Sequence, residues 1–399
     1  MKDIKMVNIN KIDLYEWIIL LPIIWAFSGQ LLTSDAYKAM IAMSIVSLAV
    51  SVWRYGYNTI IDNIANNRWI QIIGIMLISS IFYKEYSGAV SSGVLRAYAI
   101  MLISLICLPK ALTHKLLKNL HWLLLISSLT MLTYTILNMY HWGNPRALWD
   151  INPIPYTTIS SAVAISSLCY FLTSTSKEIR NVSLITLIFS FNALVIGLSR
   201  GPFLALLCSM FITIIFIHIK KSLNYSKLLS AIFVMLLSIT INSSLVTERV
   251  KTTEESISTV KAGGTDSSIG ARLELWKSST HLILEYPILG LGNKEKLYRE
   301  ELANNGIIAP STTQWSHYHN QYIDTFVKQG FLGLFLLILL VVYPLTQIKY
   351  LDTLPASIIL GILSTFWVAA LTDNPMNNAQ PLIVFLALIS LVLQNIRKV

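Results

Sequence analysis

The sequence predicts an all-α protein that crosses a membrane about twelve times, and three observations lead to this fold class. Hydrophobic residues make up 54% of the 399 residues, whereas charged residues make up only 13%. Soluble domains have about a quarter of their residues charged. The apolar residues also form long uninterrupted runs, and lysine and arginine gather in alternate connections between those runs. Together these features indicate a polytopic membrane protein.

The individual helices follow from the length of the apolar runs. A helix that spans a bilayer needs about 20 mostly apolar residues. The runs that approach this length are centred on 14–32, 37–53, 69–83, 93–109, 119–138, 157–174, 182–199, 201–219, 227–245, 322–346, 354–371 and 379–396. The seventh and eighth runs are separated only by a tight turn at 199–202.

Lysine and arginine orient these helices, because short cytoplasmic connections carry an excess of both. With the N-terminus inside, the cytoplasmic segments hold sixteen of them, and the short external segments hold only five: Lys38, Lys84, Arg96, Arg146 and Arg200. Both termini are therefore expected in the cytoplasm. The same charge asymmetry allows a bacterial inner membrane, in which the external side would be the periplasm. Since most of the net charge of +10 sets topology in this way, we expect no binding of nucleic acid.

One connection, 246–321, is much longer than the others. The predicted organisation is thus membrane helices in 1–245, a large external loop in 246–321 and membrane helices in 322–399. Long loops without structure are uncommon, so this one should contain helices, and the apolar spacing favours 270–285 and 294–304. Residues 261–268 are expected to be flexible. The loop holds eight basic and nine acidic residues, so a few placed residues must bind any anion there.

Two histidines, His317 and His319, lie where this loop enters the next membrane helix. Histidine has a near-neutral pKa and can remove a proton from a sugar hydroxyl, although a histidine that is merely satisfied at an interface is the alternative for His319. Along an extended chain His317 would point the other way, where it could contact a phosphate. Asn320 and Tyr322 from the same stretch are further candidates for substrate binding.

Two arginines and an aspartate complete the candidate set. Arg200 lies in the external turn before a helix and Arg272 at the start of the predicted loop helix; a guanidinium binds phosphate oxygens in pairs and stays charged when desolvated. The alternatives are a headgroup contact for Arg200 and a helix partner such as Glu248 for Arg272. Asp373 lies in an external turn, where it either forms the turn or orients the base.

Motifs for metals and nucleotides are absent from the sequence. It contains no Asp-x-Asp, His-Glu-x-x-His, phosphate-binding loop or dinucleotide fingerprint. We therefore expect no metal and no cofactor. The two arginines can instead stabilise a pyrophosphate leaving group.

Four segments together resemble one protein family. His319 and Asn320, followed after nine residues by Gly330 and then Gly333, are similar to the His-[Asn/Ser/Gln]-x9-Gly-x-x-[Gly/Thr/Tyr] signature of the bacterial O-antigen ligases. The segment 268–276 around Arg272 resembles the arginine motif in the large periplasmic loop of that family. Residues 198–201 and 371–373 resemble its arginine turn and its acidic position near the C-terminus.

The resemblance implies a GT-C-like fold and a reaction. O-antigen polysaccharide linked to undecaprenyl pyrophosphate would be transferred to lipid A–core at the periplasmic face, without metal and with inversion of the anomeric centre. It implies that His319 is the general base, that Arg272 and Arg200 bind the donor pyrophosphate, and that Asp373 supports the site. We expect a monomer in contact with membrane lipids.

Three other functions remain open on the sequence. An O-antigen polymerase uses the same donor but commonly has two sizeable external loops, and a protein O-oligosaccharyltransferase is usually longer. A secondary transporter would explain the number of helices. It would, however, place charged or broken segments in the middle of the membrane, whereas the ionisable residues here lie at helix ends.

Overall fold

The computed structural model describes residues 12–262 and 267–394. Within this part of the chain there are seventeen α-helices, several short helical turns and no β-strand. The helices are α1 (Leu14–Ala26), α2 (Ala39–Tyr55), α3 (Tyr57–Asn66), α4 (Arg68–Ser87), α5 (Ser92–Ile106), α6 (Lys110–Lys118), α7 (Leu120–Ile136), α8 (Pro153–Thr173), α9 (Lys177–Ile196), α10 (Arg200–Ile219), α11 (Tyr225–Ile241), α12 (Ser243–Lys261), α13 (Ser268–Glu285), α14 (Glu295–Asn304), α15 (Gln321–Gln347), α16 (Thr353–Ala370) and α17 (Ala379–Leu393).

The protein is an all-α membrane protein with several spans, as predicted, but the structure supports fewer than twelve. Among the described residues, eight helices are long and apolar enough to cross a membrane, or up to ten if each bent pair of helices forms one span. The bent pairs are α5 with α6, at 108°, and α11 with α12, at 80°. Each of the twelve predicted runs coincides with a helix, but α17 has only 15 residues, and α4 carries charges near both ends.

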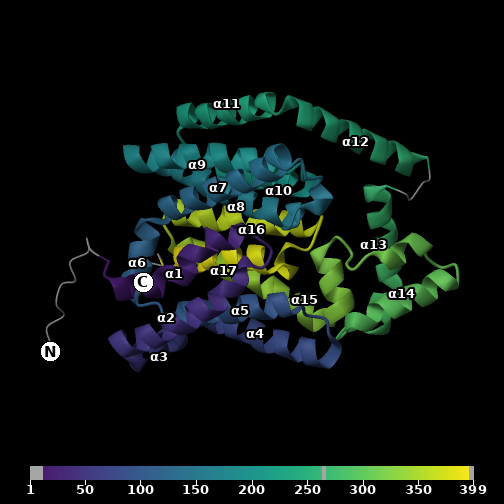
Figure 1. The fold of residues 1–399 in the computed structure, drawn as a ribbon, viewed down its shortest axis with the longest axis horizontal. Helices are drawn as coiled ribbons and strands as arrows, with labels where there is room; N and C mark the ends of the chain where they lie inside the picture. The colour runs from purple at the N-terminus through teal and green to yellow at the C-terminus, as the bar shows by residue number, and fades with distance from the viewer. Residues whose placement is uncertain (1–11, 263–266, 395–399) are drawn as a thin grey trace.

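The helices are packed in layers around a central group (Figure 1). In the middle lie α8, α16 and α17, and the side chains of α8 are buried over almost its whole length. In the view of Figure 1, α9 and α10 cover this group on one side, and α4 and α5 lie on the other. The helices α13 and α14 of the long loop lie together at one end of the bundle, far from α3 and α6 at the other. We call the end with α13 and α14 the site end.

Both helices predicted within the long loop are present, as α13 and α14. The loop also contains a helix that the sequence analysis missed, because the chain bends at Asn242 and continues as α12. Of the stretch predicted to be flexible, residues 263–266 lie outside the described residues. The loop is therefore largely helical.

The long loop is hydrogen-bonded to the next helix, α15, at a point where that helix is interrupted. Asn320 caps the start of α15, and the helix is interrupted at Gly330, whose φ is +64°. The interruption frees backbone groups that a continuous helix would use. The Phe331 N–H donates to the Pro287 carbonyl at 2.7 Å, and the Leu291 N–H donates to the Val327 carbonyl at 2.8 Å. The segment after α13 is thereby hydrogen-bonded directly to α15.

Glycine is required at the break for two reasons. A positive φ is unfavourable for residues with a side chain. In addition, a Cβ at Gly330 would collide with the carbonyl oxygen of Ile288. Opposite it, Gly290 also has a positive φ of +71°, and a Cβ there would collide with the backbone of Lys328. The first glycine of the histidine motif is thus explained by the close approach of two backbones.

We predict that Gly330→Ala destabilises the protein by about 1–3 kcal/mol, because the strained φ and the backbone collision both have to be relieved. The apparent melting temperature in detergent should fall, and protease should cut the segment between α13 and α15 sooner. Gly74→Ala, at a helical glycine of α4 with open space around it, serves as the control. Equal melting temperatures for the two variants would contradict this account of the break.

Candidate functional site

Tyr318 lies between the two candidate histidines in the sequence, and contacts with α13 and α14 fix its position. Its side chain is fully buried, and its hydroxyl donates to Glu295 Oε2 at 3.0 Å. The guanidinium of Arg299 lies over its ring, 5.2 Å from the centroid. Trp276 Nε1 donates to the Tyr318 carbonyl at 2.9 Å. His317 and His319 therefore extend from a point that α13 and α14 hold fixed.

The backbone at His319 turns in a way that brings both histidine rings to one side. Its φ is +48°, in the left-handed region that few residues with side chains adopt. The next residue, Asn320, accepts hydrogen bonds from the N–H groups of Tyr322 and Ile323 as the helix cap. The expectation from an extended chain, that His317 points away from His319, is therefore wrong. Strained backbone of this kind is concentrated at functional sites.

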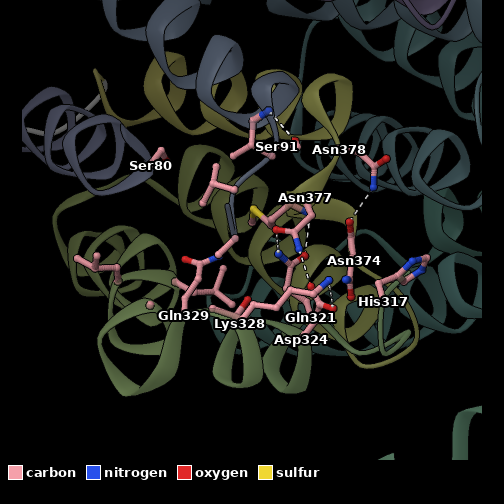
Figure 2. Close-up of a pocket in the computed structure, with 18 of the residues that line it drawn as sticks. Ser80, Ser91, His317, Gln321, Asp324, Lys328, Gln329, Asn374, Asn377 and Asn378 are labelled. Atoms are coloured by element: carbon pink, nitrogen blue, oxygen red, sulfur yellow. Dashed lines mark hydrogen bonds and ion pairs between the residues drawn. The ribbon is translucent and has the colours of Figure 1, made fainter. Parts of the chain in front are cut away.

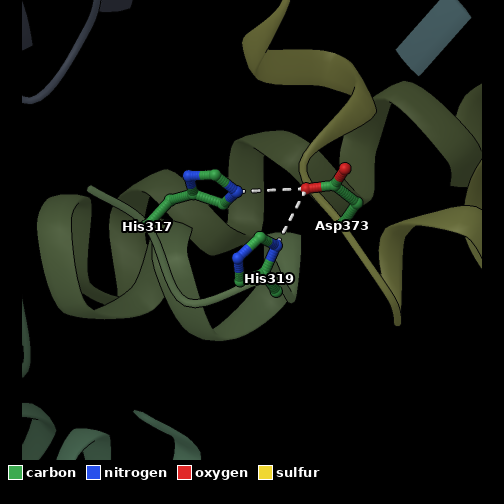
Figure 3. Close-up of side chains that lie close together, drawn as sticks. All are labelled: His317, His319 and Asp373. Carbon is green, nitrogen blue, oxygen red and sulfur yellow. Dashed lines mark hydrogen bonds and ion pairs between the residues drawn. The ribbon is translucent and has the colours of Figure 1, made fainter. Parts of the chain in front are cut away.

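Asp373 joins the two histidines (Figure 3). Nε2 of His317 lies 3.2 Å from Asp373 Oδ1, within hydrogen-bond distance. Nδ1 of His319 lies 3.5 Å from the same oxygen, which is long for a hydrogen bond. The centroids of the two rings are 4.2 Å apart. Asp373 is 5% exposed and lies in the turn between α16 and α17, so it is not merely a surface turn residue. We call these three residues the His–Asp–His cluster.

The two histidines differ in the nitrogen that remains available. Nδ1 of His317 contacts Ser316 Oγ at 3.1 Å, so both of its ring nitrogens have partners. His319 faces Asp373 through Nδ1, and in the described part of the chain no hydrogen bond occupies its Nε2. An imidazole that is oriented by a carboxylate at one nitrogen and free at the other is the arrangement of a general base. His319 fits this role better than His317.

The pKa shifts in the cluster agree with this assignment. Burial lowers the pKa of His319; contact with Asp373 acts against this effect, and the nearby charges of His317 and Arg272 add to it. Neutral imidazole, the form that accepts a proton, is thus favoured near pH 7. For Asp373, burial acts to raise the pKa, but the two histidines outweigh it and the pKa is lowered. The aspartate therefore stays ionised.

Arg200 and Arg272 approach each other at Ser268, although they are 72 positions apart. Nη2 of Arg200 donates to the Ser268 hydroxyl at 3.3 Å. Nη1 of Arg272 donates to the Ser268 carbonyl, also at 3.3 Å. Burial lowers the pKa of Arg272; the charge of Asp373 opposes this shift and that of Arg200 adds to it. Arg272 thus interacts electrostatically with both Arg200 and the His–Asp–His cluster.

Two further arginines, which the sequence analysis did not select, belong to the same group. Nη2 of Arg146 donates to Ser199 Oγ at 2.8 Å. Burial lowers the pKa of Arg146 to about 10, and the charges of Arg249 and Arg200 contribute. Arg146 was one of only five cations predicted in the short external segments, which was a usable signal. Arg249 lies on the unpredicted helix α12, so the sequence contained no comparable signal for it.

These four residues, Arg146, Arg200, Arg249 and Arg272, form what we call the arginine cluster. In the part of the chain that the structure describes, none of the four forms an ion pair with a carboxylate. The Nε atoms of Arg146, Arg249 and Arg272 are buried without a hydrogen-bond partner. Buried donors are rarely left unpaired in proteins, and guanidinium groups pair best with phosphate or carboxylate oxygens. The cluster has the character of an anion-binding site.

An apolar cavity of about 360 Å³ adjoins this cluster. Arg200 and Arg249 contribute to its wall, and most of the remaining wall is apolar, including Phe203, Leu207 and Val246. A second cavity, of about 570 Å³, has His317 and Asp373 of the His–Asp–His cluster in its wall. The site end thus has an apolar and a polar cavity near one His–Asp–His cluster.

The His–Asp–His cluster also has the donor set of a metal site. One ligand atom from each of His317, His319 and Asp373 can be chosen so that the three lie within 4.8 Å of one another. Two imidazoles and a carboxylate suit a transition metal such as zinc. The sequence contains no metal motif, because these ligands come from segments 54 residues apart. A bound ion would compete with the proton for the histidine nitrogens.

Comparison with known proteins found a match to a protein family and a match to a relative. Residues 185–338, less than half of the chain, match the O-antigen ligase family. The chain is 31% identical over 99 residues to an uncharacterised protein of Haemophilus influenzae, a match that covers 24% of this chain and 25% of the relative. The chain thus spans about a quarter of that relative. The family match includes three of the four arginines and both histidines of the cluster, so this part of the chain is similar to the O-antigen ligase family.

Proposed function

We propose that this protein is an O-antigen ligase, which transfers O-antigen polysaccharide from undecaprenyl pyrophosphate to lipid A–core. One observation supports this function above all: a histidine with a free nitrogen, whose other ring nitrogen lies 3.5 Å from a buried aspartate, shares the site end with four arginines that have no carboxylate partner among the described residues. The base suits a sugar hydroxyl as acceptor, and the arginines suit a diphosphate as leaving group. The match to the O-antigen ligase family supports a lipid-linked glycan as donor.

The donor would bind with its diphosphate at the arginine cluster and part of its hydrocarbon chain in the apolar cavity. Arg200 and Arg249 line that cavity, so its polar end coincides with the cluster. Two of its apolar wall residues, Leu204 and Leu207, are exposed on the protein surface. A polyprenyl chain tens of ångströms long could therefore continue from the cavity into the bilayer.

His319 and the arginine cluster together account for the chemical step. Nε2 of His319 removes the proton of the acceptor hydroxyl as its oxygen bonds to the anomeric carbon of the donor. The bond between that carbon and the phosphate oxygen breaks, and its electron pair leaves on the diphosphate. Attack opposite the leaving group inverts the anomeric centre. The arginine cluster neutralises the charge that develops on the diphosphate, so the step needs neither metal nor nucleotide.

The other candidate residues would act by positioning. Asp373 holds the His319 ring and stabilises its protonated form. Asn320 fixes the backbone at His319 through the helix cap. The Tyr322 hydroxyl donates to the Trp367 carbonyl at 2.8 Å and so ties α15 to α16. His317, beside the polar cavity, is suited to contact the acceptor.

The orientation in the membrane follows from charge. With sixteen lysines and arginines on one side and five in short segments on the other, we infer cytoplasmic termini, a periplasmic site and the bacterial inner membrane. In this orientation all twelve apolar runs would cross the bilayer. We also infer that the enzyme acts as a monomer.

Transfer can be measured with purified protein, lipid-linked O-antigen and lipopolysaccharide that lacks O-antigen, in the presence of a chelator. A ligase makes capped lipopolysaccharide. A polymerase makes longer lipid-linked chains instead, and a transporter makes neither product. If transfer is lost with the chelator and restored by zinc, the His–Asp–His cluster is a metal site and the metal-free mechanism is wrong.

We predict that His319→Ala lowers the rate of transfer by roughly 10²–10⁴-fold, the usual contribution of a general base. Arg272→Ala and Arg200→Ala should each lower it by about 10²–10³-fold, as does removal of a donor to a developing oxyanion. His281→Ala and Lys277→Ala, at exposed positions of α13, should retain the wild-type rate. Near-normal transfer by well-folded His319→Ala would exclude it as the base.

The pH dependence should report the His319 pKa. Only neutral His319 can accept a proton, so kcat/KM should fall as the pH drops through that pKa. Because burial holds the pKa below 6.5, this decline should lie on the acid side of 6.5. Asp373→Asn removes a group that raises the pKa of His319, so the decline should move to lower pH and the maximal rate should drop. Asp62→Asn, at an exposed position of α3, should leave the profile unchanged; a shift to higher pH in Asp373→Asn would contradict this assignment.

Arg146→Gln and Arg249→Gln should each raise the KM for the lipid-linked donor by about tenfold, the effect of losing one hydrogen bond to a charged group. The KM for the acceptor should not change. Arg96→Gln, at an arginine of α5 outside the cluster, is the matched control. An unchanged donor KM in both variants would remove Arg146 and Arg249 from the donor site.

A further inference from the structure

The cavity of about 570 Å³ at the site end has a different chemistry from the arginine cluster. It lies between α4, α5, α15 and the turn that carries Asp373 (Figure 2). Its size is within the range of small-molecule sites, about 300–1,000 Å³. His317 and Asp373 belong to its wall, whereas none of the four arginines of the arginine cluster does. The His–Asp–His cluster therefore separates an anion-binding region from this second space.

Uncharged amides dominate the polar part of its wall. Gln321, Gln329, Asn374, Asn377 and Asn378 all line the cavity, and several come from the short turn after Asp373. An amide offers both donors and an acceptor, which suits sugar hydroxyls, since each of these also donates and accepts. We call this space the amide-lined cavity.

The charges on its wall are already paired. Among the described residues that line the cavity, Lys328 is the only lysine or arginine. Its Nζ lies 2.9 Å from Asp324 Oδ1 and 2.9 Å from the Ser316 carbonyl. A ligand with a phosphate or carboxylate group would find no free cation here, and it would face the carboxylates of Asp324 and Asp373. The wall thus disfavours anionic ligands.

Two buried polar groups on the wall have no hydrogen-bond partner among the residues that the structure describes. Asn374 is 4% exposed and Thr325 is 3% exposed. Asn374 Oδ1 and Thr325 Oγ1 are both buried without a hydrogen bond. Both residues line the amide-lined cavity. Because buried polar atoms are normally satisfied, these two indicate a polar occupant.

We infer that the amide-lined cavity binds the terminal sugar of the acceptor, and that this sugar is neutral, without phosphate or carboxylate groups. This inference rests on the proposed function. The cavity ends at the His317 ring, whose centroid lies 4.2 Å from that of His319. A sugar bound there presents a hydroxyl next to the base, opposite the arginine cluster that binds the donor. Discrimination between core sugars would then arise from the amides and from Thr325.

Binding can be tested separately from transfer, by calorimetry with purified full-length protein and without donor. The probes are a core oligosaccharide that ends in a neutral hexose and the same oligosaccharide with that hexose phosphorylated. The neutral probe should bind, and the phosphorylated one should bind at least tenfold more weakly. Equal or tighter binding of the phosphorylated probe would overturn the inference. If the neutral probe binds as expected but no glycan is transferred when donor is added, the proposed function fails instead.

Thr325→Val locates the binding site, because it removes the unpaired hydroxyl and keeps the shape of the side chain. It should weaken binding of the neutral probe about fivefold to tenfold, the value of roughly one hydrogen bond. It should also raise the KM for the acceptor and leave the KM for the donor unchanged. Thr213→Val is the matched control: Thr213 Oγ1 is likewise buried without a partner, but this residue lies on α10, outside the cavity. Equal affinities in the two variants would overturn the assignment of the cavity.

Discussion

The burial of Tyr318 against Arg299 and Glu295 is the constraint from which the geometry of the site follows. Arg299 is itself fully buried, and it donates to the carbonyls of Thr312 and Trp315 at 2.8 and 2.7 Å. A buried charge is costly unless it is paired and hydrogen-bonded, and here Glu295 and two carbonyls meet that need. The residues on either side of Tyr318 can then turn to the same face, which places two histidines on one aspartate.

Electrostatics divides the site end into two regions. On one side, four arginines lie together without a carboxylate partner in the described part of the chain, so a bound anion would relieve their mutual repulsion. On the other, the amide-lined cavity has one paired lysine and no excess positive charge. Asp373 lies between them, and its contacts with the two histidines stabilise its ionised form. A site of this kind is suited to hold a charged leaving group and a neutral nucleophile at the same time.

The break in α15 connects the membrane-embedded and extramembrane parts of the chain. Because Gly330 opens the helix, the segment after α13 forms backbone hydrogen bonds with α15, and α13 carries Arg272 and Trp276. The same helix begins with the cap at Asn320, directly after His319. The helix α15 thereby fixes the position of the base, His319, and of the loop that carries Arg272. This explains physically why a histidine and a glycine eleven positions later occur together in one motif.

The sequence by itself determined the helical fold class, the positions of the twelve apolar runs, the two loop helices and the two stretches that contain the histidines and Arg272. These features are local, since they depend on the length and period of apolar runs and on residue type. It did not reveal α12, the bends after α5 and α11, or Arg249, and it misjudged the direction of His317. Those depend on the left-handed backbone at His319 and on contacts between segments such as Ser268 and Arg200. Only the tertiary structure decided them, because partners that are distant in the chain leave no period or spacing in the sequence.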